Sequence, residues 1–291
     1  MLTILTPSFN RCDLLKRLYR SLEKQSSKNF KWIIIDDGSS DDTEEYISNL
    51  KTKSSFEISY YKKINGGKHT ALNQGFSLIK TEWFAIVDSD DWLKPDCVET
   101  LLSEIERLRN NESCIVTHRS FPDGTINGDV FVEGSYSYLE RKYNNIKGDK
   151  FEVYNTKVVE NFRFPVYEGE KFMAESPLHM YVGNNYNSKF LNYSGYVGDY
   201  LEGGLTYDSV KNRYANVNST LFVYSNQYSS LKFSKAKVRA GINWWRFYFS
   251  LKGGSTNDHI SYILSPFGFL LYFRDLLYFR DLLNDKKKQS S

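Results

Sequence analysis

The sequence predicts an α/β protein with a mainly parallel sheet. Apolar segments of strand length alternate with amphipathic segments of helical period over the first hundred residues. Two of the strand-like segments end in acidic residues, Asp36-Asp37 and Asp88-Ser89-Asp90-Asp91. Strands joined by crossover helices form parallel sheets covered on both faces, and such sheets bind ligands at the carboxyl ends of their strands. We therefore expect a ligand site along this edge.

The expected elements follow from the spacing of apolar residues. The leucines of 13–24 share one helical face, whereas uninterrupted apolar runs such as 32–35 predict buried strands. The acidic turn at 36–40 is expected to cap the next helix, and Pro95 suits the first turn of a later one. The expected order is a strand at 2–6, a helix at 13–24, a strand at 32–35, a helix around 46–50, a strand at 56–61, a helix around 71–79, a strand at 83–88 and a helix from Pro95 to about residue 108.

The run that ends at Asp88 is the most specific of these signals. Residues 83–87 are apolar and are followed at once by three carboxylates, two of them in an Asp-x-Asp spacing. Carboxylate oxygens are the ligands that Mg²⁺ and Mn²⁺ prefer. A calcium-binding EF-hand loop is excluded, because Trp92 and Leu93 stand where that loop needs an oxygen ligand and a turn glycine. The pattern favours a site for a metal and a diphosphate.

Composition restricts the class of partner. The 291-residue chain carries a formal net charge of only +3 and no basic stripe, so we expect no nucleic-acid binding. Its three cysteines have no Cys-x-x-Cys spacing, which argues against a disulfide framework or a zinc site and fits a reducing cytosol. Without a basic leader or an apolar run of about 18 residues, we expect neither secretion nor a membrane span.

The C-terminal region contains an exact duplication. Residues 272–277 and 278–283 both read Tyr-Phe-Arg-Asp-Leu-Leu, and 286–288 are lysines. On a helix this repeat gives a broad apolar face and leaves its Arg and Asp residues polar. Such a helix suits a membrane interface, with the lysines attracted to anionic lipid. We expect peripheral membrane contact through residues 263–288; packing on the rest of the chain or on a second subunit is the alternative.

Four short stretches follow the expected strands in a fixed order. They are Thr6-Pro7-Ser8-Phe9-Asn10-Arg11, Asp36-Asp37-Gly38-Ser39, Asn65-Gly66-Gly67-Lys68 with Asn73, and Asp88-Ser89-Asp90-Asp91. Together they closely resemble the N-terminal half of the glycosyltransferase family 2 enzymes, which have a GT-A fold and transfer sugars with inversion. The resemblance implies a GT-A (Rossmann-like) fold with a mixed, mainly parallel sheet and a helical C-terminal extension.

The resemblance also implies roles for residues in these stretches. One of Asp36 and Asp37 would accept a hydrogen bond from the nucleotide base, and Lys68 would offset diphosphate charge. Asp88 would bind ribose or metal, and Asp90 would be the main ligand of a Mn²⁺ or Mg²⁺ ion that stabilises the departing diphosphate. The residues expected around the donor are Pro7, Ser8, Asn10, Arg11, Asp36, Asp37, Gly67, Lys68, Asn73, Asp88 and Ser89.

Inversion needs a base that takes the proton of the attacking acceptor hydroxyl. Family members usually supply it from a Glu-Asp pair in the second half of the domain, and the nearest match is the segment 165–175. Lys171 stands where the Asp is expected. The remaining candidates, in order of preference, are Glu170, Glu175 and Glu168.

Two further residues complete the expected site. His179 follows Glu175 by four residues, where it would contact metal or acceptor; a structural histidine in the core is the alternative. Thr206 follows a Gly-Gly pair where related enzymes carry a flexible segment over the donor diphosphate, and it would bond a phosphate oxygen. A hairpin turn is the alternative for this segment.

We therefore expect a cytoplasmic, metal-dependent, inverting glycosyltransferase at the inner face of the cell membrane. It would move a sugar from a UDP-type donor to a glycan, with a lipid-linked acceptor favoured by the C-terminal helix, in bacterial surface polysaccharide synthesis. The altered Lys171 position supports one alternative, a catalytically silent nucleotide-sugar or glycan-binding subunit, and a homo-oligomer is left open. The expected parts are a nucleotide-sugar-binding half at 1–105, an acceptor and catalytic-base half at 106–230, and a helical region at 231–291.

Overall fold

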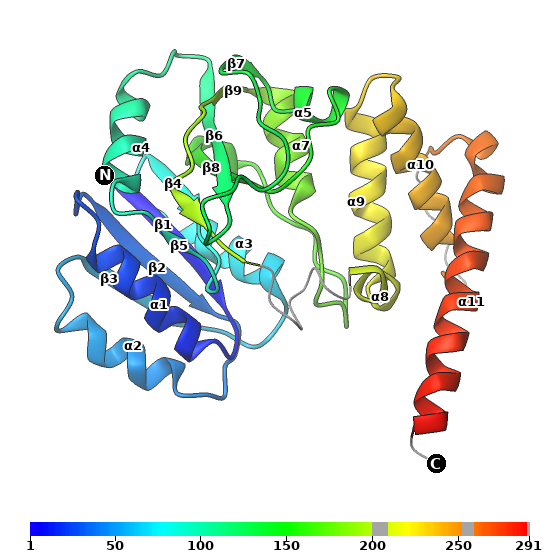
Figure 1. Ribbon diagram of the computed structural model, residues 1–291, viewed down its shortest axis with the longest axis horizontal. Helices are drawn as coiled ribbons and strands as arrows, with labels where there is room; N and C mark the ends of the chain where they lie inside the picture. Colours follow the sequence, from blue (N-terminus) through cyan, green and yellow to red (C-terminus); the bar gives the residue numbers. More distant parts are fainter. Residues whose placement is uncertain (200–208, 252–258, 290–291) are drawn as a thin grey trace.

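The computed structural model places a sheet at one end of the molecule and three long helices at the other (Figure 1). It describes residues 1–199, 209–251 and 259–289, with side chains as far as residue 279. Within these residues, ten strands form one mixed sheet in the order β3-β2-β1-β4-β8-β6-β10-β5, and β9 pairs with β6 and β7. The strands are β1 (Leu2–Ser8), β2 (Phe30–Asp36), β3 (Glu57–Lys62), β4 (Trp83–Ile86), β5 (Trp92–Leu93), β6 (Glu112–Ser120), β7 (Gly134–Ser137), β8 (Lys150–Asn155), β9 (Asn187–Phe190) and β10 (Tyr196–Val197).

Helices cover both faces of this sheet. Because successive strand residues point to opposite faces, Ile34 belongs to the core that also contains residues of α1, α2 and α4. Ile33 and Ile35 belong to the core that contains residues of α3, α6 and α7. Two apolar cores result, one on each side of the sheet. The helices are α1 (Cys12–Glu23), α2 (Thr43–Lys51), α3 (Lys68–Leu78), α4 (Cys97–Glu106), α5 (Glu140–Tyr143), α6 (Lys157–Glu160) and α7 (Ser176–Asn185).

The register of the parallel strands brings the expected ligand loops together. Strands β3, β2, β1 and β4 are all parallel neighbours. Ser8 at the end of β1 lies opposite Asp36 at the end of β2, and Leu5 lies opposite Ile86 at the end of β4. The loops after these strands therefore leave the sheet at the same edge, as the sequence predicts.

The C-terminal region is helical and has a core of its own. It contains α8 (Ser209–Ala215), α9 (Val217–Ser230), α10 (Lys235–Tyr248), the short 3₁₀ turn η1 (Tyr262–Leu264) and α11 (Ser265–Gln289). Helix α9 packs on α7 and α10, and α10 packs on α11. Leu221, Trp244 and Phe247 are buried in this third core.

One expectation about the duplicated segment is wrong. Asp275 is not a solvated polar position: it is buried, at 5% exposure. Its Oδ2 accepts hydrogen bonds from Arg246 Nε on α10 (2.5 Å) and from the Tyr214 hydroxyl on α8 (2.7 Å). The polar position of the first repeat thus fixes α11 to the molecule. The side chains of the second repeat beyond residue 279 lie outside the described residues.

The expected fold class is confirmed: the sheet is mixed and mainly parallel, and the C-terminal region is helical. The start of α4 differs slightly, since that helix begins at Cys97 and Pro95 precedes it. The division at residues 105 and 230 stays a prediction, and strands from both sides of residue 105 pair in the same sheet. Among the described helices, none is both long and apolar enough to cross a membrane.

Candidate active site

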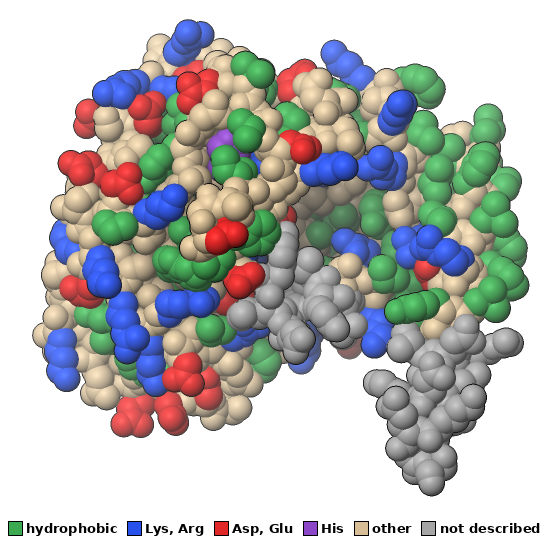
Figure 2. Space-filling view, viewed as in Figure 1, with side chains coloured by type: hydrophobic (Ala, Val, Ile, Leu, Met, Phe, Trp, Pro, Cys, Tyr) green, Lys and Arg blue, Asp and Glu red, His purple; other side chains and the backbone are tan. Residues whose placement is uncertain are grey.

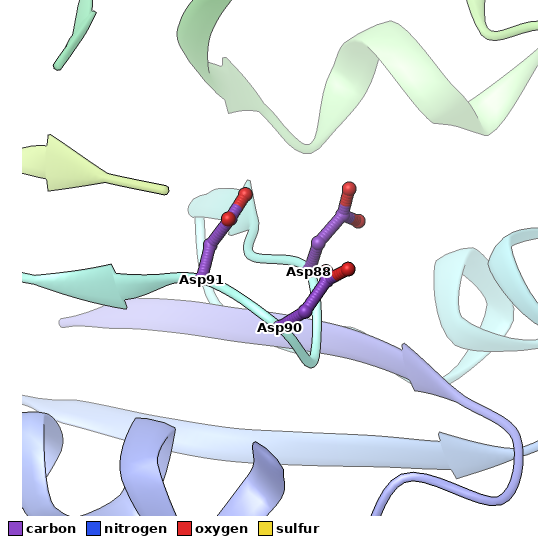
Figure 3. A group of neighbouring side chains, drawn as sticks. All are labelled: Asp88, Asp90 and Asp91. Carbon is purple, nitrogen blue, oxygen red and sulfur yellow. The ribbon is translucent and has the colours of Figure 1, made fainter. Parts of the chain in front are cut away.

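Three carboxylates converge on the connection between β4 and β5. Figure 3 shows Asp88, Asp90 and Asp91 projecting from this short loop. One oxygen from each lies within 4.8 Å of the others. An all-oxygen donor set of this kind fits a hard divalent cation such as Mg²⁺ or Mn²⁺.

Each of the three carboxylates also contacts a basic side chain. Asp88 pairs with Lys68 Nζ at 2.6 Å. Asp90 pairs with Arg11 Nη1 at 3.2 Å, and Asp91 with Arg119 Nη2 at 3.2 Å. The cations offset the repulsion between closely spaced acids and keep the loop compact.

Asp91 differs from the other two because it is buried. Only 4% of it is exposed, and its Oδ2 accepts a 2.6 Å hydrogen bond from the Tyr196 hydroxyl of β10. Burial raises the pKa of Asp91 to about 7, the charge of Asp88 acts in the same direction, and Arg119 opposes both. Asp91 therefore anchors the loop to β10, while half-buried Asp88 and Asp90 are the carboxylates open to a ligand.

The loops after β1 and β2 support each other. Asn10, which has a positive φ of 51°, accepts a 2.8 Å hydrogen bond from the Ser40 backbone N–H through its Oδ1. Its own N–H donates to Ser39 Oγ at 2.8 Å. Arg11 then reaches Asp90 across the edge. Hydrogen bonds therefore join Asn10 to the loop after β2, and an ion pair joins Arg11 to the acid loop after β4.

The acidic residues after β2 accept hydrogen bonds from loop N–H groups. The expectation that this turn caps the next helix is wrong. Asp36 accepts from the Ser39 N–H at 2.8 Å and from the Tyr60 hydroxyl. Asp37 accepts from the N–H groups of Gly66 and Gly67, at 3.0 and 2.7 Å, and pairs with Lys63 Nζ at 2.7 Å. Helix α2 begins instead after Asp42, with no side-chain cap.

Gly67 is required by a close approach of two backbones. It has a φ of +91°, and a Cβ built at this position would lie 1.9 Å from the Lys171 carbonyl oxygen. The resemblance places Gly67 among the residues around the donor. The structure instead shows that Gly67 admits the segment that carries the candidate bases.

Replacing Gly67 by Ala is expected to destabilise the protein much more than replacing Gly169 by Ala. Gly169 also has a positive φ, +75°, but its Cβ would meet nothing within 4 Å. Both variants lose about 1–3 kcal/mol because Ala rarely adopts a positive φ, and only Gly67→Ala loses about 1–3 kcal/mol more from the clash. Urea unfolding of both variants measures the difference; equal losses would contradict the close approach.

Glu170, the base that the sequence favours, accepts hydrogen bonds from the first turn of α9. It is buried, at 8% exposure. Its Oε1 accepts from the Asn218 N–H at 2.8 Å and its Oε2 from the Ser219 N–H at 2.7 Å. A carboxylate that satisfies the free N–H groups of a helix N-terminus stabilises that helix. Both oxygens of Glu170 are therefore used in holding α9.

Glu175, the second candidate base, is linked to the acid loop through Lys68. Its Oε1 pairs with Lys68 Nζ at 2.5 Å, and the same ammonium group contacts Asp88 at 2.6 Å. Desolvation of Lys68 is outweighed by these two carboxylates, which raise its pKa well above the usual range, so it stays charged. Glu168, the third candidate, is exposed in the turn before Gly169.

His179 is not part of the carboxylate group found among the described residues. Its ring stacks on Tyr138, with the ring centroids 4.8 Å apart. Burial lowers the pKa of His179 to about 3, and the charges of Arg141, Lys142 and Lys68 act in the same direction. A neutral, stacked ring fits the alternative interpretation of His179 as a structural histidine in the core. Among the described residues, the group of side chains that could hold a metal contains only aspartates.

The remaining expected donor residues have different surroundings. Ser8 is 4% exposed, and its Oγ has no hydrogen-bond partner among the described residues, which fits a ligand contact. Asn73 instead forms two hydrogen bonds with the Phe164 backbone, through Nδ2 at 2.8 Å and Oδ1 at 2.9 Å. Pro7 lies in β1 and Ser89 within the acid loop, whereas Thr206 falls outside the described residues.

Sequence reasoning missed the groups that support the acid loop from other elements. Arg17 of α1 donates to the Asp90 carbonyl oxygen and lies 4.3 Å from the ring centroid of Trp92. Tyr196 and Arg119 hold Asp91 from β10 and β6. No local motif marks these residues, because each acts across more than 25 positions of sequence.

A site at this edge of the sheet is typical of α/β proteins that bind nucleotides at the carboxyl ends of their strands. Residues 3–159 match the profile described as "Glycosyl transferase family 2", which is more than half of the chain. The chain therefore belongs to glycosyltransferase family 2.

Curated relatives agree with this assignment. Glycosyltransferase GlyA of Streptococcus pneumoniae is 26% identical over 199 residues, which cover 67% of this chain and 28% of the relative. The GalNAc(5)-diNAcBac-PP-undecaprenol beta-1,3-glucosyltransferase of Campylobacter jejuni is 27% identical over 171 residues, or 56% of this chain and 54% of that protein. The chain thus spans between about a quarter and a half of the length of these relatives.

Solved structures show the same fold. Residues 1–349 of TarS from S. aureus, in complex with UDP, superpose with a TM-score of 0.61 at 17% identity, covering 86% of this chain and 72% of that one. The mannosyltransferase PcManGT of Pyrobaculum calidifontis, in complex with GDP-Man and Mn²⁺, has a TM-score of 0.56 at 14% identity, covering 95% of this chain and 79% of that one. The protein has the GT-A fold expected from its sequence.

Proposed function

We propose that the protein is a metal-dependent, inverting glycosyltransferase that uses a UDP-sugar donor. One observation carries the proposal: a single ammonium group, Lys68 Nζ, contacts both Asp88 of the acid loop and Glu175. A group that binds the departing diphosphate and a group that takes a proton must both border the space that the transferred sugar would enter. Lys68 brings the two carboxylates to one place.

Asp88 and Asp90 are the proposed ligands of a Mn²⁺ or Mg²⁺ ion. Their carboxylates are half-buried and lie in the group whose oxygens approach within 4.8 Å. When bound, the ion stabilises negative charge on the diphosphate leaving group. Arg11 and Lys68, which pair with these carboxylates, would then be free to contact diphosphate oxygens.

Glu175 is the proposed catalytic base, in place of Glu170. In a direct displacement, the acceptor oxygen bonds to the anomeric carbon while the bond from that carbon to the diphosphate oxygen breaks. Glu175 takes the hydroxyl proton, and the nucleoside diphosphate leaves from the opposite face. Lys68 Nζ, 2.5 Å from Glu175 Oε1, fixes the position of this carboxylate beside the acid loop.

Residues at the ends of β1 and β2 are the proposed nucleotide site. The Ser8 hydroxyl has no hydrogen-bond partner among the described residues, and Ser8 lies opposite Asp36 in the sheet. Asn10 is bonded to Ser40 in the loop that follows Asp37. UDP is the proposed nucleotide because TarS, which shares the fold, has been solved with UDP and with UDP-GlcNAc. A lipid-linked glycan is the proposed acceptor, since the name of the Campylobacter relative states an undecaprenol-linked one.

A nucleotide screen tests this proposal. UDP and one UDP-sugar are expected to raise the melting temperature of the protein with Mn²⁺, because the diphosphate and the ion bind together. EDTA should abolish the shift, and GDP and CDP should give smaller ones. Equal stabilisation by UDP with Mn²⁺ and with EDTA would contradict the metal site.

A further inference from the structure

The outer face of α11 is apolar and exposed. The face that contacts α10 and α8 carries Gly268, Tyr272 and Asp275, which pack on Trp245, Phe249 and Arg246. The opposite face presents large apolar side chains to solvent. Those at least 40% exposed are Phe267, Phe269, Leu270, Phe273, Leu276, Leu277 and Tyr278, and Tyr262 and Ile263 of η1 are about 80% exposed.

An apolar groove with basic residues lies beside this face. A pocket of about 630 Å³ opens between α10 and α11. Its apolar lining comes from Phe233, Val238, Ile242 and Leu271. Phe233, at the turn before α10, is 92% exposed, which is exceptional for a phenylalanine. Figure 2 shows hydrophobic side chains gathered at this end of the molecule, with Lys and Arg side chains among them.

The charged side chains that line the groove are all basic. Lys235 and Arg239 line it, one helical turn apart, and both are exposed, as is Lys232 beside Phe233. The sequence has no acidic residue between positions 231 and 251. Between 259 and 279 the acidic residue is Asp275, which is buried and paired with Arg246 and Arg274.

We infer that this surface, made of the α10–α11 groove and the outer face of α11, docks on an anionic phospholipid bilayer. The apolar face would enter the headgroup region, and Lys232, Lys235 and Arg239 would bind lipid phosphates. A second copy of the chain fits less well, because a two-fold interface would bring the same cations against one another. No described helix spans a bilayer, so the contact is peripheral.

This inference deepens the proposed function, since a lipid-linked acceptor is presented at a bilayer, but its test does not use glycosyl transfer. The full chain is sedimented with vesicles of phosphatidylcholine alone and of phosphatidylcholine with phosphatidylglycerol. We expect binding to the anionic vesicles and not to the neutral ones. Salt should weaken it, because exposed charges are screened.

Two pairs of substitutions separate the charge from the apolar contribution. The double variant Lys235→Gln/Arg239→Gln should lose about 30-fold in vesicle affinity, since each basic residue near an anionic surface contributes about a factor of five. The double variant Phe233→Ser/Leu270→Ser should lose at least as much. Lys53→Gln/Lys80→Gln, which removes two exposed charges on the sheet end of the molecule, is the matched control and should bind as the wild type does.

Light scattering and UDP affinity complete the test. All variants should bind UDP and Mn²⁺ as the wild type does, which shows that they are folded. Vesicle binding that is equal on neutral and anionic lipid, or that survives both pairs of substitutions, would overturn the inference. A dimer that Phe233→Ser/Leu270→Ser dissociates, without any vesicle binding by the wild type, would assign the surface to a second copy instead.

Discussion

Replacing Asp90 by Asn is expected to abolish Mn²⁺-dependent UDP binding and activity. Asp90 is half-buried and pairs with Arg11 in the acid loop. The Asn side chain has nearly the same size but lacks the negative charge that would bind the ion. Loss of a group that merely supports a metal ligand typically costs 10- to 100-fold in affinity, so loss of a direct ligand should cost about 100-fold or more. Calorimetric titration of UDP with Mn²⁺ measures the effect.

A matched carboxylate elsewhere controls for general effects of charge. Asp123 lies exposed in the turn after β6, where it accepts hydrogen bonds from Thr125. Asp123→Asn should leave UDP affinity and metal dependence unchanged. If Asp90→Asn binds UDP with wild-type affinity and the same response to Mn²⁺, Asp90 is not a metal ligand.

Replacing Glu175 by Gln is expected to remove turnover while donor binding survives. The amide keeps the shape of the side chain and a contact with Lys68, but it cannot take a proton. General-base catalysis contributes about 10²–10⁴-fold, so kcat should fall by about that factor. UDP affinity with Mn²⁺ should change by less than about threefold, because no proposed nucleotide contact is lost.

Replacing Glu170 by Gln is expected to lower stability and to leave most of the turnover. Glu170→Gln should lower the free energy of unfolding by about 1–2 kcal/mol, because the start of α9 loses a charged acceptor. Its kcat per folded molecule should stay within about tenfold of the wild type, below the loss expected for a base. Glu168→Gln, in an exposed turn, should change neither quantity. A large loss of kcat in Glu170→Gln with full activity in Glu175→Gln would restore Glu170 as the base.

The N-terminal half of the fold is predictable from the sequence because its signals are local. Buried strand β2 contains the continuous apolar run 32–35, and α1 carries its leucines on one face. The site loops follow directly from strand ends, and parallel register then brings Ser8 beside Asp36. Chain order and strand direction suffice for this part of the site.

The C-terminal helices and the base are harder to predict because their signals are not local. Helix α9 is rich in Ser, Asn and Thr, which are poor helix formers, and it is stabilised by packing on α7 and α10 and by Glu170. The sequence cannot show that Glu170 serves α9, since its partners lie 48 and 49 residues away. The same holds for Asp275, because its partners Arg246 and Tyr214, which attach α11 to α10 and α8, lie 29 and 61 residues away.

UDP release from a UDP-sugar is the most direct test of the proposed activity. The donor that stabilises the protein is incubated with it and with lipid-linked glycans extracted from a bacterial membrane, once with Mn²⁺ and once with EDTA. We expect acceptor-dependent UDP release with Mn²⁺, none with EDTA, and inversion at the anomeric carbon of the product. Folded protein that binds the donor with Mn²⁺ but releases no UDP would contradict the enzyme and favour a nucleotide-sugar-binding subunit.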